Sequence, residues 1–466
     1  MMRITIRPFQ EVRLLARPSR ILRPFSSAAR TLGPAETDTS VSSSSTASSS
    51  SRIGRISESS IRPSPTPHVS ATEDKTTVSW PDGRTTTFDN YFLFDHCRCP
   101  KCFHSKTKQR LKELNQIPDD IRPVAVEVDN SGVHLSWSTS EEHKSTFPFE
   151  FLRRSAYDPP LSSYRDATEG RVLWNSKIAQ SPPSVVYEDI IRSDDEALKS
   201  ERAILKLLNR VHDFGFCFVN NVPATPEKTQ ELIEKIAPIR HTHYGGFWEF
   251  TADQSHGDLA YSNEGLPCHT DTTYFTDPAG LQIFHLLSHP SPPGTGGTTL
   301  LVDGFYTASL LSTLYPTSYS LLSRLRIPAH ASGTEGTMLR PPLSQPAFRH
   351  DEKGQLTQVR WNNEDRGVLG QGWSAEEVKG WYQAARRYDE LNKSEDAEYW
   401  VQLGPGTMLV IDNWRVMHGR SAFTGARQMC GAYVGADDWS SRRTALTKKH
   451  EIRKKSILDD DWSVGW

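Results

Sequence analysis

Two short segments that lie far apart in the chain place the strongest constraint on its fold. The first contains the tripeptide His269-Thr270-Asp271, and the second contains His418, which follows an apolar run at 408–411. Side chains at positions i and i+2 of an extended strand point to the same face, so His269 and Asp271 can hold one metal ion from one side. His418 would complete a 2-His-1-carboxylate site with open positions, which is typical of iron that reacts with oxygen.

Arg427 lies nine residues after His418 and strengthens this interpretation. On a following strand, its planar guanidinium would lie beside the metal and bind a carboxylate through two hydrogen bonds. That arrangement favours a dicarboxylic cosubstrate. The His-x-Asp tripeptide alone is weak evidence, because it also occurs in solvated loops and at hydrogen-bonded edges.

Length and charge narrow the class of protein. The 466 residues are 24% charged, carry a formal net charge of −2 and suffice for two or three domains. They show no basic excess of the kind that binds nucleic acid. No apolar run approaches the roughly 18 residues needed to span a bilayer. We therefore expect a soluble protein without nucleic-acid or membrane partners.

The first 35 residues differ sharply from the rest. Among the first thirty, Glu11 is the one acid, and the arginines are Arg3, Arg7, Arg13, Arg17, Arg20, Arg23 and Arg30. This pattern is typical of a mitochondrial transit peptide, and it predicts a protein of the mitochondrial matrix. The alternative is a disordered basic arm. Residues 36–70 are dominated by Ser, Thr and Pro and predict a disordered linker.

Residues 71–155 predict a small β-rich domain. Two hairpins are expected, one from 77–80 and 85–88 and one from 124–128 and 133–137, each with a polar turn at its centre. Between the hairpins lie three cysteines, Cys97, Cys99 and Cys102.

Thiolates this close together form either a metal cage or an oxidisable cluster. A matrix protein has little use for structural disulfides, so tetrahedral zinc is favoured. The expected fourth ligand is His143, with His104 and His134 as alternatives. Four protein ligands would close the site, and the ion would then stabilise the domain without catalysing a reaction.

Residues 185–445 predict the second domain. Capping-box spacing at Ser193 and Glu196 predicts a helix to Val211, followed by a buried strand at 214–219 and a helix at 226–238. A second capping box, at Ser374 and Glu377, predicts another helix before strands near 400 and 407.

Metal ligands on two separated strands, with helices at the flanks, favour a mainly β double-stranded β-helix, the jelly roll of cupins. Residues 446–466 form a C-terminal tail with a basic cluster, which is either a solvated face or a helix that packs on a second subunit.

Three runs of residues carry a family resemblance: 269–275, 296–305 and 412–420. Over about residues 72 to 445, the chain resembles the trimethyllysine dioxygenases and the related gamma-butyrobetaine dioxygenases. The resemblance implies that His269, Asp271 and His418 bind Fe(II). It also implies that Arg427 and Thr299 bind the distal carboxylate of 2-oxoglutarate, and that zinc is held by Cys97, Cys99, Cys102 and His143.

The resemblance further implies a substrate site. Four aromatic residues match a quaternary ammonium cage, although each alone is more often a core residue: Tyr244, Trp248, Tyr261 and Tyr433. Asp258 offers an anion for an α-ammonium, which favours trimethyllysine over gamma-butyrobetaine, and surface solvation is its alternative role. Asn362 and Asn363 are expected to bind the substrate carboxylate, or else to form a turn.

The implied reaction hydroxylates C3 of N6,N6,N6-trimethyl-L-lysine and converts 2-oxoglutarate and O2 to succinate and CO2, the first step of carnitine biosynthesis. Ascorbate would keep the iron reduced, and family members form dimers. Two alternatives stay open: a gamma-butyrobetaine dioxygenase that makes carnitine, and a non-catalytic scaffold stabilised by zinc. Strand alternation predicts that Cys268 points away from the metal.

Overall fold

The computed structural model describes residues 66–139, 141–161, 170–251, 262–289, 296–333, 335–370 and 372–451. The predicted transit peptide, most of the predicted linker and most of the C-terminal tail lie outside these residues. The N-terminal part comprises β1 His68–Ala71, β2 Lys75–Ser79, β3 Thr85–Asp89, α1 Asn90–Asp95, β4 Phe103–His104, β5 Gln109–Arg110, a 3-10 turn Leu114–Gln116, β6 Pro123–Asp129, β7 Gly132–Trp137, β8 Lys144–Phe147 and α2 Phe149–Arg154.

Both predicted hairpins of the N-terminal part are present. β2 pairs with β3, and β6 pairs with β7, all antiparallel. Their alternating apolar side chains meet in one core that includes Val78, Phe88, Leu135 and Phe147. The predicted linker extends too far, because His68–Ala71 pairs with β2 and forms the edge strand of a three-stranded sheet.

The second part comprises a 3-10 turn Ser176–Gln180, β9 Ser184–Val186, α3 Tyr187–Ile190, a 3-10 turn Asp194–Glu196, α4 Ala197–Phe214, β10 Phe216–Asn220, α5 Pro226–Ile236, β11 Ile239–Arg240, β12 Phe247–Thr251, β13 Leu266–His269, β14 Leu281–Ser288, β15 Thr299–Asp303, α6 Gly304–Leu314, α7 Pro316–Arg324, β16 Phe348–His350, β17 Leu356–Val359, α8 Ala375–Asn392, β18 Tyr399–Val401, β19 Met408–Asp412, β20 Val416–Arg420, β21 Gln428–Val434 and α9 Ala436–Glu451.

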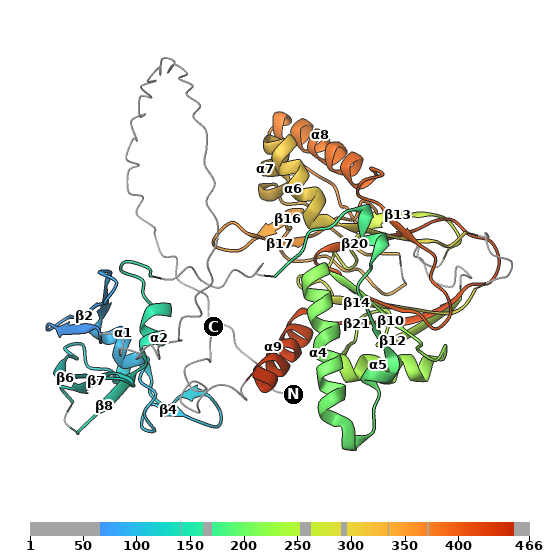
Figure 1. The fold of residues 1–466 in the computed structure, drawn as a ribbon. Coiled ribbons are helices and arrows are strands. Elements are labelled where there is room, and N and C mark those ends of the chain that lie inside the picture. The colour runs from blue at the N-terminus through green and yellow to red at the C-terminus, as the bar shows by residue number, and fades with distance from the viewer. Residues whose placement is uncertain are drawn as a thin grey trace, which may run out of the picture. The chain divides into compact units, whose positions relative to one another are not determined.

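Two β-sheets organise this part (Figure 1). The larger sheet has the order β11-β21-β14-β19-β10-β9 with β12 also on β21, and the smaller has the order β13-β20-β15-β18. Apolar side chains from both sheets pack together between them, including Leu286, Leu301, Leu409 and Val416. Apart from the parallel pair of β9 and β10, both sheets are antiparallel, and two such sheets that share a core form the predicted jelly roll, which is confirmed.

Helices cover the outer faces of the two sheets. The larger sheet packs on α4, α5 and α9 through residues such as Leu207, Leu232 and Leu446. The smaller sheet packs on α6 and α8 through residues such as Phe305, Trp381 and Tyr388. Because each sheet is covered on its outer side, nearly all β15, β19, β20 and β21 residues are buried.

The structure tests the two capping boxes that we predicted at helix N-termini. The capping box of α8 is confirmed, since Ser374 Oγ accepts from the Glu377 amide and the Glu377 carboxylate accepts from the Ser374 amide. The capping box at Ser193 is wrong. α4 begins at Ala197, and the Glu196 carboxylate instead pairs with Arg192 and Lys199.

The predicted domain limits need correction at both ends. Trp174 is buried in the core between the sheets, ahead of the predicted start at 185. Leu446 is buried on α9, so the predicted C-terminal tail begins inside a packed helix. Phe214, which we placed in a strand, ends α4 before Gly215, whose φ of +78° allows the chain to turn into β10.

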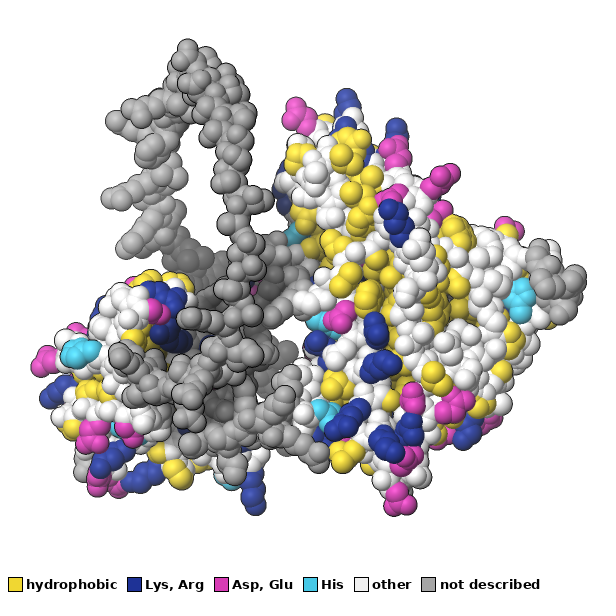
Figure 2. Space-filling view, in the orientation of Figure 1, with side chains coloured by type: hydrophobic (Ala, Val, Ile, Leu, Met, Phe, Trp, Pro, Cys, Tyr) yellow, Lys and Arg dark blue, Asp and Glu magenta, His cyan; other side chains and the backbone are white. Residues whose placement is uncertain are grey.

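The distribution of charged side chains on the surface is consistent with the formal net charge of −2. Basic and acidic side chains are interspersed on the described residues of the face shown in Figure 2. None of the helices in the described part of the chain combines the length and apolar character needed to span a bilayer.

Candidate active site

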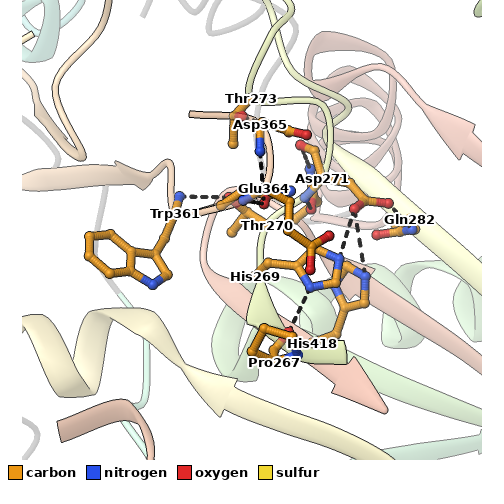
Figure 3. Close-up of polar contacts among 12 residues, drawn as sticks. Pro267, His269, Thr270, Asp271, Thr273, Gln282, Trp361, Glu364, Asp365 and His418 are labelled. Atoms are coloured by element: carbon orange, nitrogen blue, oxygen red, sulfur yellow. Dashed lines mark hydrogen bonds and ion pairs between the residues drawn. The ribbon is translucent and has the colours of Figure 1, made fainter. Parts of the chain in front are cut away.

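The two histidines of the predicted metal site are direct neighbours. β13 and β20 are adjacent antiparallel strands, and His269 lies opposite His418 in their register. Asp271 Oδ1 lies 3.1 Å from His269 Nε2 and 3.9 Å from His418 Nε2 (Figure 3). One ligand atom from each residue lies within 4.8 Å of the others, so the three can hold one metal ion.

Gly419 permits this close approach of the two strands. A Cβ atom at this position would lie 2.6 Å from the carbonyl oxygen of Leu266. Glycine therefore lets β20 approach β13 closely between His418 and Arg420. Cys268 points away from the metal ligands, as strand alternation predicted, and packs with Val302 and Met417.

Asp271 reaches the site in a different way from the one we predicted. β13 ends at His269, and Asp271 lies in the following turn, where Thr272 has a φ of +58°. Asn413 holds this turn. Its Oδ1 accepts from the Asp271 amide at 2.8 Å, and its Nδ2 donates to the carbonyl oxygens of Asp271 and Ala279, each at 3.0 Å.

Two further side chains fix the Asp271 carboxylate. Tyr433 Oη donates to Oδ2 at 2.7 Å, and the Gln282 amide donates to the same oxygen. Oδ1 is left facing the two imidazoles. His269 Nδ1 donates to the carbonyl oxygen of Pro267 at 2.8 Å, which directs Nε2 toward the carboxylate. Gln282 and Asn413 were not among the predicted site residues.

The charges at the site suit a divalent cation. Burial lowers the pKa of His269, but its hydrogen bond and ion pair with Asp271 outweigh burial and raise it to about 9. Burial and the charge of His269 lower the pKa of His418 to about 3. Burial alone would raise the pKa of Asp271, yet the two histidines hold it below its usual value. A divalent ion would therefore displace a proton from His269, and binding would strengthen as pH rises.

The pocket that the metal ligands line is also lined by two arginines, Arg420 and Arg427, and by Thr299. Arg427 lies just before β21 and is 4% exposed, and Thr299 begins β15 opposite Arg420. Burial and the charge of Arg420 lower the pKa of Arg427 to about 9, and burial lowers that of Arg420 to about 10. Both stay protonated near neutral pH. Two buried guanidiniums favour an anionic ligand here. Arg420 was not predicted.

Aromatic rings line the same pocket. Tyr244, Trp248 and Tyr433 are all among its lining residues, and the Trp248 and Tyr433 ring centroids lie 6.5 Å apart. Tyr274, which we did not predict, also lines it, and its hydroxyl lies 3.2 Å from that of Tyr244. The structure thus brings three of the four predicted rings together. Tyr261 and Asp258 lie outside the described residues.

Of the two predicted asparagines, one lines the pocket of the metal ligands, and both line a second hollow. Asn362 lines the pocket, but its Oδ1 accepts from the amides of Glu364 and Asp365, so this oxygen serves a turn. Asn363 does not line this pocket, but it lines the second hollow together with Asn362 and Trp361. That both asparagines bind the substrate carboxylate stays a prediction.

Comparison with known proteins places the chain in a family. Residues 178–433 match the model of the taurine catabolism dioxygenase TauD, TfdA family, and residues 68–153 match a gamma-butyrobetaine hydroxylase-like N-terminal model. A trimethyllysine dioxygenase of Meyerozyma guilliermondii is 40% identical over 393 residues, which is 83% of this chain and 96% of that protein. The chain belongs to the trimethyllysine dioxygenase family.

Two further members of the trimethyllysine dioxygenase family have a similar sequence identity to this chain. The protein of Neurospora crassa is 42% identical over 77% of this chain and 80% of its own length. The human protein, named as mitochondrial, is 38% identical over 75% of this chain and 80% of its own length. The chain is thus an oxidoreductase of the dioxygenase class.

The N-terminal part of this dioxygenase contains a second candidate metal group. His143 Nε2 lies 3.3 Å from Cys97 Sγ, 3.5 Å from Cys99 Sγ and 3.4 Å from Cys102 Sγ. Zinc bond lengths in a tetrahedral site imply a nitrogen-to-sulfur separation of about 3.6 Å. His104 and His134 lie elsewhere. His104 accepts from the Thr107 amide, and His134 contacts Asp129 and Thr146.

The charges of the thiols also suit a cation. A hydrogen bond from Cys102, helped by His143, lowers the pKa of Cys97 to about 4. The same bond raises the pKa of Cys102, and burial raises that of Cys99. Without an ion, repulsion therefore keeps the three thiols from ionising together. A zinc ion would supply the positive charge that three thiolates need.

Proposed function

We propose that the chain hydroxylates C3 of N6,N6,N6-trimethyl-L-lysine and couples this step to the conversion of 2-oxoglutarate and O2 into succinate and CO2. This is the first step of carnitine biosynthesis. The observation that carries the proposal is one pocket lined by His269, Asp271 and His418 together with buried guanidiniums and aromatic rings. The printed names of the relatives support the substrate.

His269, Asp271 and His418 would hold Fe(II), which with 2-oxoglutarate supplies the oxidising power for the C–H bond. We propose that ascorbate keeps this iron reduced. Arg427 and Thr299 would bind the distal carboxylate of 2-oxoglutarate, with Arg420 as a second cation. A carboxylate desolvated in this pocket needs such a partner, because an unpaired buried charge is costly.

The aromatic residues would bind the trimethylammonium group. This group donates no N–H hydrogen bond, so attraction to ring faces must hold it, at about 0.5 to 2 kcal/mol for each ring. Tyr244, Trp248 and Tyr433 would provide three faces, with Tyr261 as the fourth. By holding the far end of the substrate, they would orient C3 toward the metal ligands and exclude water.

The decisive experiment compares two substrates on the purified full chain with Fe(II), 2-oxoglutarate and oxygen. We expect mass spectrometry to show trimethyllysine gaining one oxygen atom, with one succinate formed per product. Oxygen gained only by gamma-butyrobetaine would reassign the substrate. No product from either compound, with metal bound, would favour a non-catalytic scaffold.

We also propose that Cys97, Cys99, Cys102 and His143 hold a structural zinc ion. Apparent binding energies of structural zinc in small peptides are about 10 to 16 kcal/mol, enough to determine whether a small domain folds. We expect metal analysis to find one zinc per chain. His143→Ala should release it and expose Trp137, which a red shift of tryptophan fluorescence would report.

The matched control for the zinc site is His104→Ala. His104 is exposed and lies two residues beyond Cys102, yet it is not part of the four-residue group. This variant should keep its zinc and its fluorescence. Zinc loss in His104→Ala but not in His143→Ala would contradict the assignment.

The remaining sequence predictions stand as proposals. Residues 1–35 would direct the chain to the mitochondrial matrix, consistent with the mitochondrial naming of mammalian relatives, and the linker predicted at 36–70 would end before β1. The small part at 68–155 would form a zinc domain, separate from the catalytic jelly roll, and the chain would form a homodimer. N-terminal sequencing of protein recovered from mitochondria tests the first proposal, and sedimentation tests the last.

A further inference from the structure

Glu364 lies in a turn at the edge of the catalytic pocket. Asn362 Oδ1 closes this turn by accepting from the Glu364 amide at 2.9 Å. Trp361, which directly precedes Asn362, forms two hydrogen bonds with the metal-ligand segment. Its amide donates to Thr270 Oγ1 at 2.9 Å, and its carbonyl oxygen accepts from the Thr270 amide at 2.8 Å. Thr270 lies between His269 and Asp271. The turn is therefore held at a fixed place beside the metal ligands.

The carboxylate of Glu364 is not committed to another group. Glu364 lines the pocket, and Figure 3 shows its side chain pointing toward the imidazoles of His269 and His418. Its charge is among those that raise the pKa of His269. No hydrogen bond or ion pair of this carboxylate occurs among the described residues. The neighbouring Asp365 differs, since its carboxylate accepts from Thr273 Oγ1 at 2.8 Å.

Glu364 is not a further metal ligand. In the part of the chain that the structure describes, the group whose ligand atoms lie within 4.8 Å of one another here consists of His269, Asp271 and His418. Glu364 is also exposed as a residue, in contrast to the buried His418. Its carboxylate therefore faces the space that a substrate would enter.

The proposed substrate leaves one charge to be balanced in this space. Its trimethylammonium faces the aromatic rings, whereas its α-ammonium is attached to the carbon next to C3. Because C3 must lie close to the metal ligands, the α-ammonium must lie close to them too. A carboxylate in the same pocket, without another partner among the described residues, is the group that would bind it.

We propose that Glu364 binds the α-ammonium of trimethyllysine and thereby selects an amino acid over betaines that lack this group. The inference rests on the proposed function. Asn362 lies on the same turn, and its Nδ2 donates no hydrogen bond among the described residues. It is placed to donate to the α-carboxylate. One turn would then recognise both charges of the amino-acid end.

The test compares two substrates on the full chain. One is trimethyllysine, and the other is 6-(trimethylammonio)hexanoate, which keeps the trimethylammonium and the carboxylate but lacks the α-ammonium. Glu364→Gln keeps the size of the side chain and removes its charge. We expect its kcat/KM for trimethyllysine to fall about tenfold, mainly through KM, because one partly exposed charged hydrogen bond is lost. Turnover of the hexanoate should be unchanged.

Two controls separate recognition from structure. Glu352→Gln removes an exposed carboxylate in the turn between β16 and β17, away from the pocket, and should leave both substrates unaffected. Calorimetry on protein loaded with Mn(II) and 2-oxoglutarate should show weaker trimethyllysine binding by Glu364→Gln, with Mn(II) affinity unchanged.

Three results would overturn the assignment of Glu364. They are an equal loss for both substrates, no change for either, or loss of discrimination in Asp258→Asn but not in Glu364→Gln. Failure of the proposed function has a different signature, since the unaltered chain would then hydroxylate no trimethyllysine. In that case the calorimetric comparison still decides whether Glu364 binds the ammonium.

Discussion

A chain with Asp271 replaced by alanine is expected to lose metal binding and hydroxylation together. Asp271 supplies the one carboxylate of the metal group, and Oδ1 is its only oxygen not engaged by Tyr433 or Gln282. Residues that merely orient metal ligands are worth about 10- to 100-fold in metal affinity. Loss of a direct ligand should cost more than about a hundredfold, and product should fall below detection.

Metal-dependent thermal stability separates this effect from misfolding. An ion that binds only the folded chain raises the melting temperature of the protein, so Mn(II) should stabilise the unaltered chain but not Asp271→Ala. The control is Asp277→Ala, six residues after Asp271, which removes a half-exposed carboxylate that pairs with Arg240. It should keep both the Mn(II) response and activity. Hydroxylation by Asp271→Ala would refute the assigned ligand set.

The sequence revealed the members of the metal site but not how they meet. A tripeptide and a distant histidine were enough to select His269, Asp271 and His418. The prediction that Asp271 shares a strand face with His269 was wrong, because β13 ends at His269. The carboxylate returns to the site through a turn that depends on Asn413, 142 residues away. Strand periodicity contains no information on such a contact.

The missed residues share a physical reason. Gln282 and Asn413 act through side-chain amides whose hydrogen-bond partners come from other segments of the chain. Amide side chains are common on surfaces and in turns, so their types alone indicate nothing. Their partners become visible only when the register of β14 and the connection from β19 to β20 are fixed.

The two segments with capping-box spacing show that prediction from sequence is also limited for contacts between residues close together in the chain. The spacing at Ser374 and at Ser193 is identical, yet an α-helix begins at the next residue only after Ser374, whereas α4 begins four residues after Ser193. At the second site, Arg192 and Lys199 compete for the Glu196 carboxylate. Glu377 also pairs with Arg324 at 2.7 Å and still accepts from the Ser374 amide, so a charged partner alone does not explain the difference. At the second site the chain forms a 3-10 turn, Asp194–Glu196, before α4 begins, and capping-box spacing does not distinguish such a turn from the first turn of an α-helix.

The run at 412–420 also contains a residue whose role is structural. Arg415 is fully buried and pairs with Asp303, at 3.1 Å from Nε to Oδ1 and 2.8 Å from Nη2 to Oδ2. It also donates to the carbonyl oxygens of Asp213 and Val172. Asp303 accepts in addition from the amides of Trp174 and Phe305. The pair thus joins the smaller sheet to the connection that precedes His418.

Asp303→Ala is expected to lower the free energy of unfolding by about 3 to 5 kcal/mol, because it leaves the guanidinium of Arg415 buried without a charge partner. Urea unfolding monitored by fluorescence measures this loss. The double variant Asp303→Ala/Arg415→Met should be less unstable than Asp303→Ala alone, since no unpaired charge remains.

An exposed ion pair provides the contrast. Lys228 and Glu231 lie 2.7 Å apart with side chains 48% and 40% exposed, so Glu231→Ala should change stability by less than about 1 kcal/mol. If Asp303→Ala lowered the free energy of unfolding no more than Glu231→Ala does, the buried pair would not stabilise the fold. If the double variant were the least stable of all, the guanidinium would contribute mainly through its bonds to the Asp213 and Val172 carbonyls. The order of the three variants therefore separates the ion pair from the backbone contacts of Arg415.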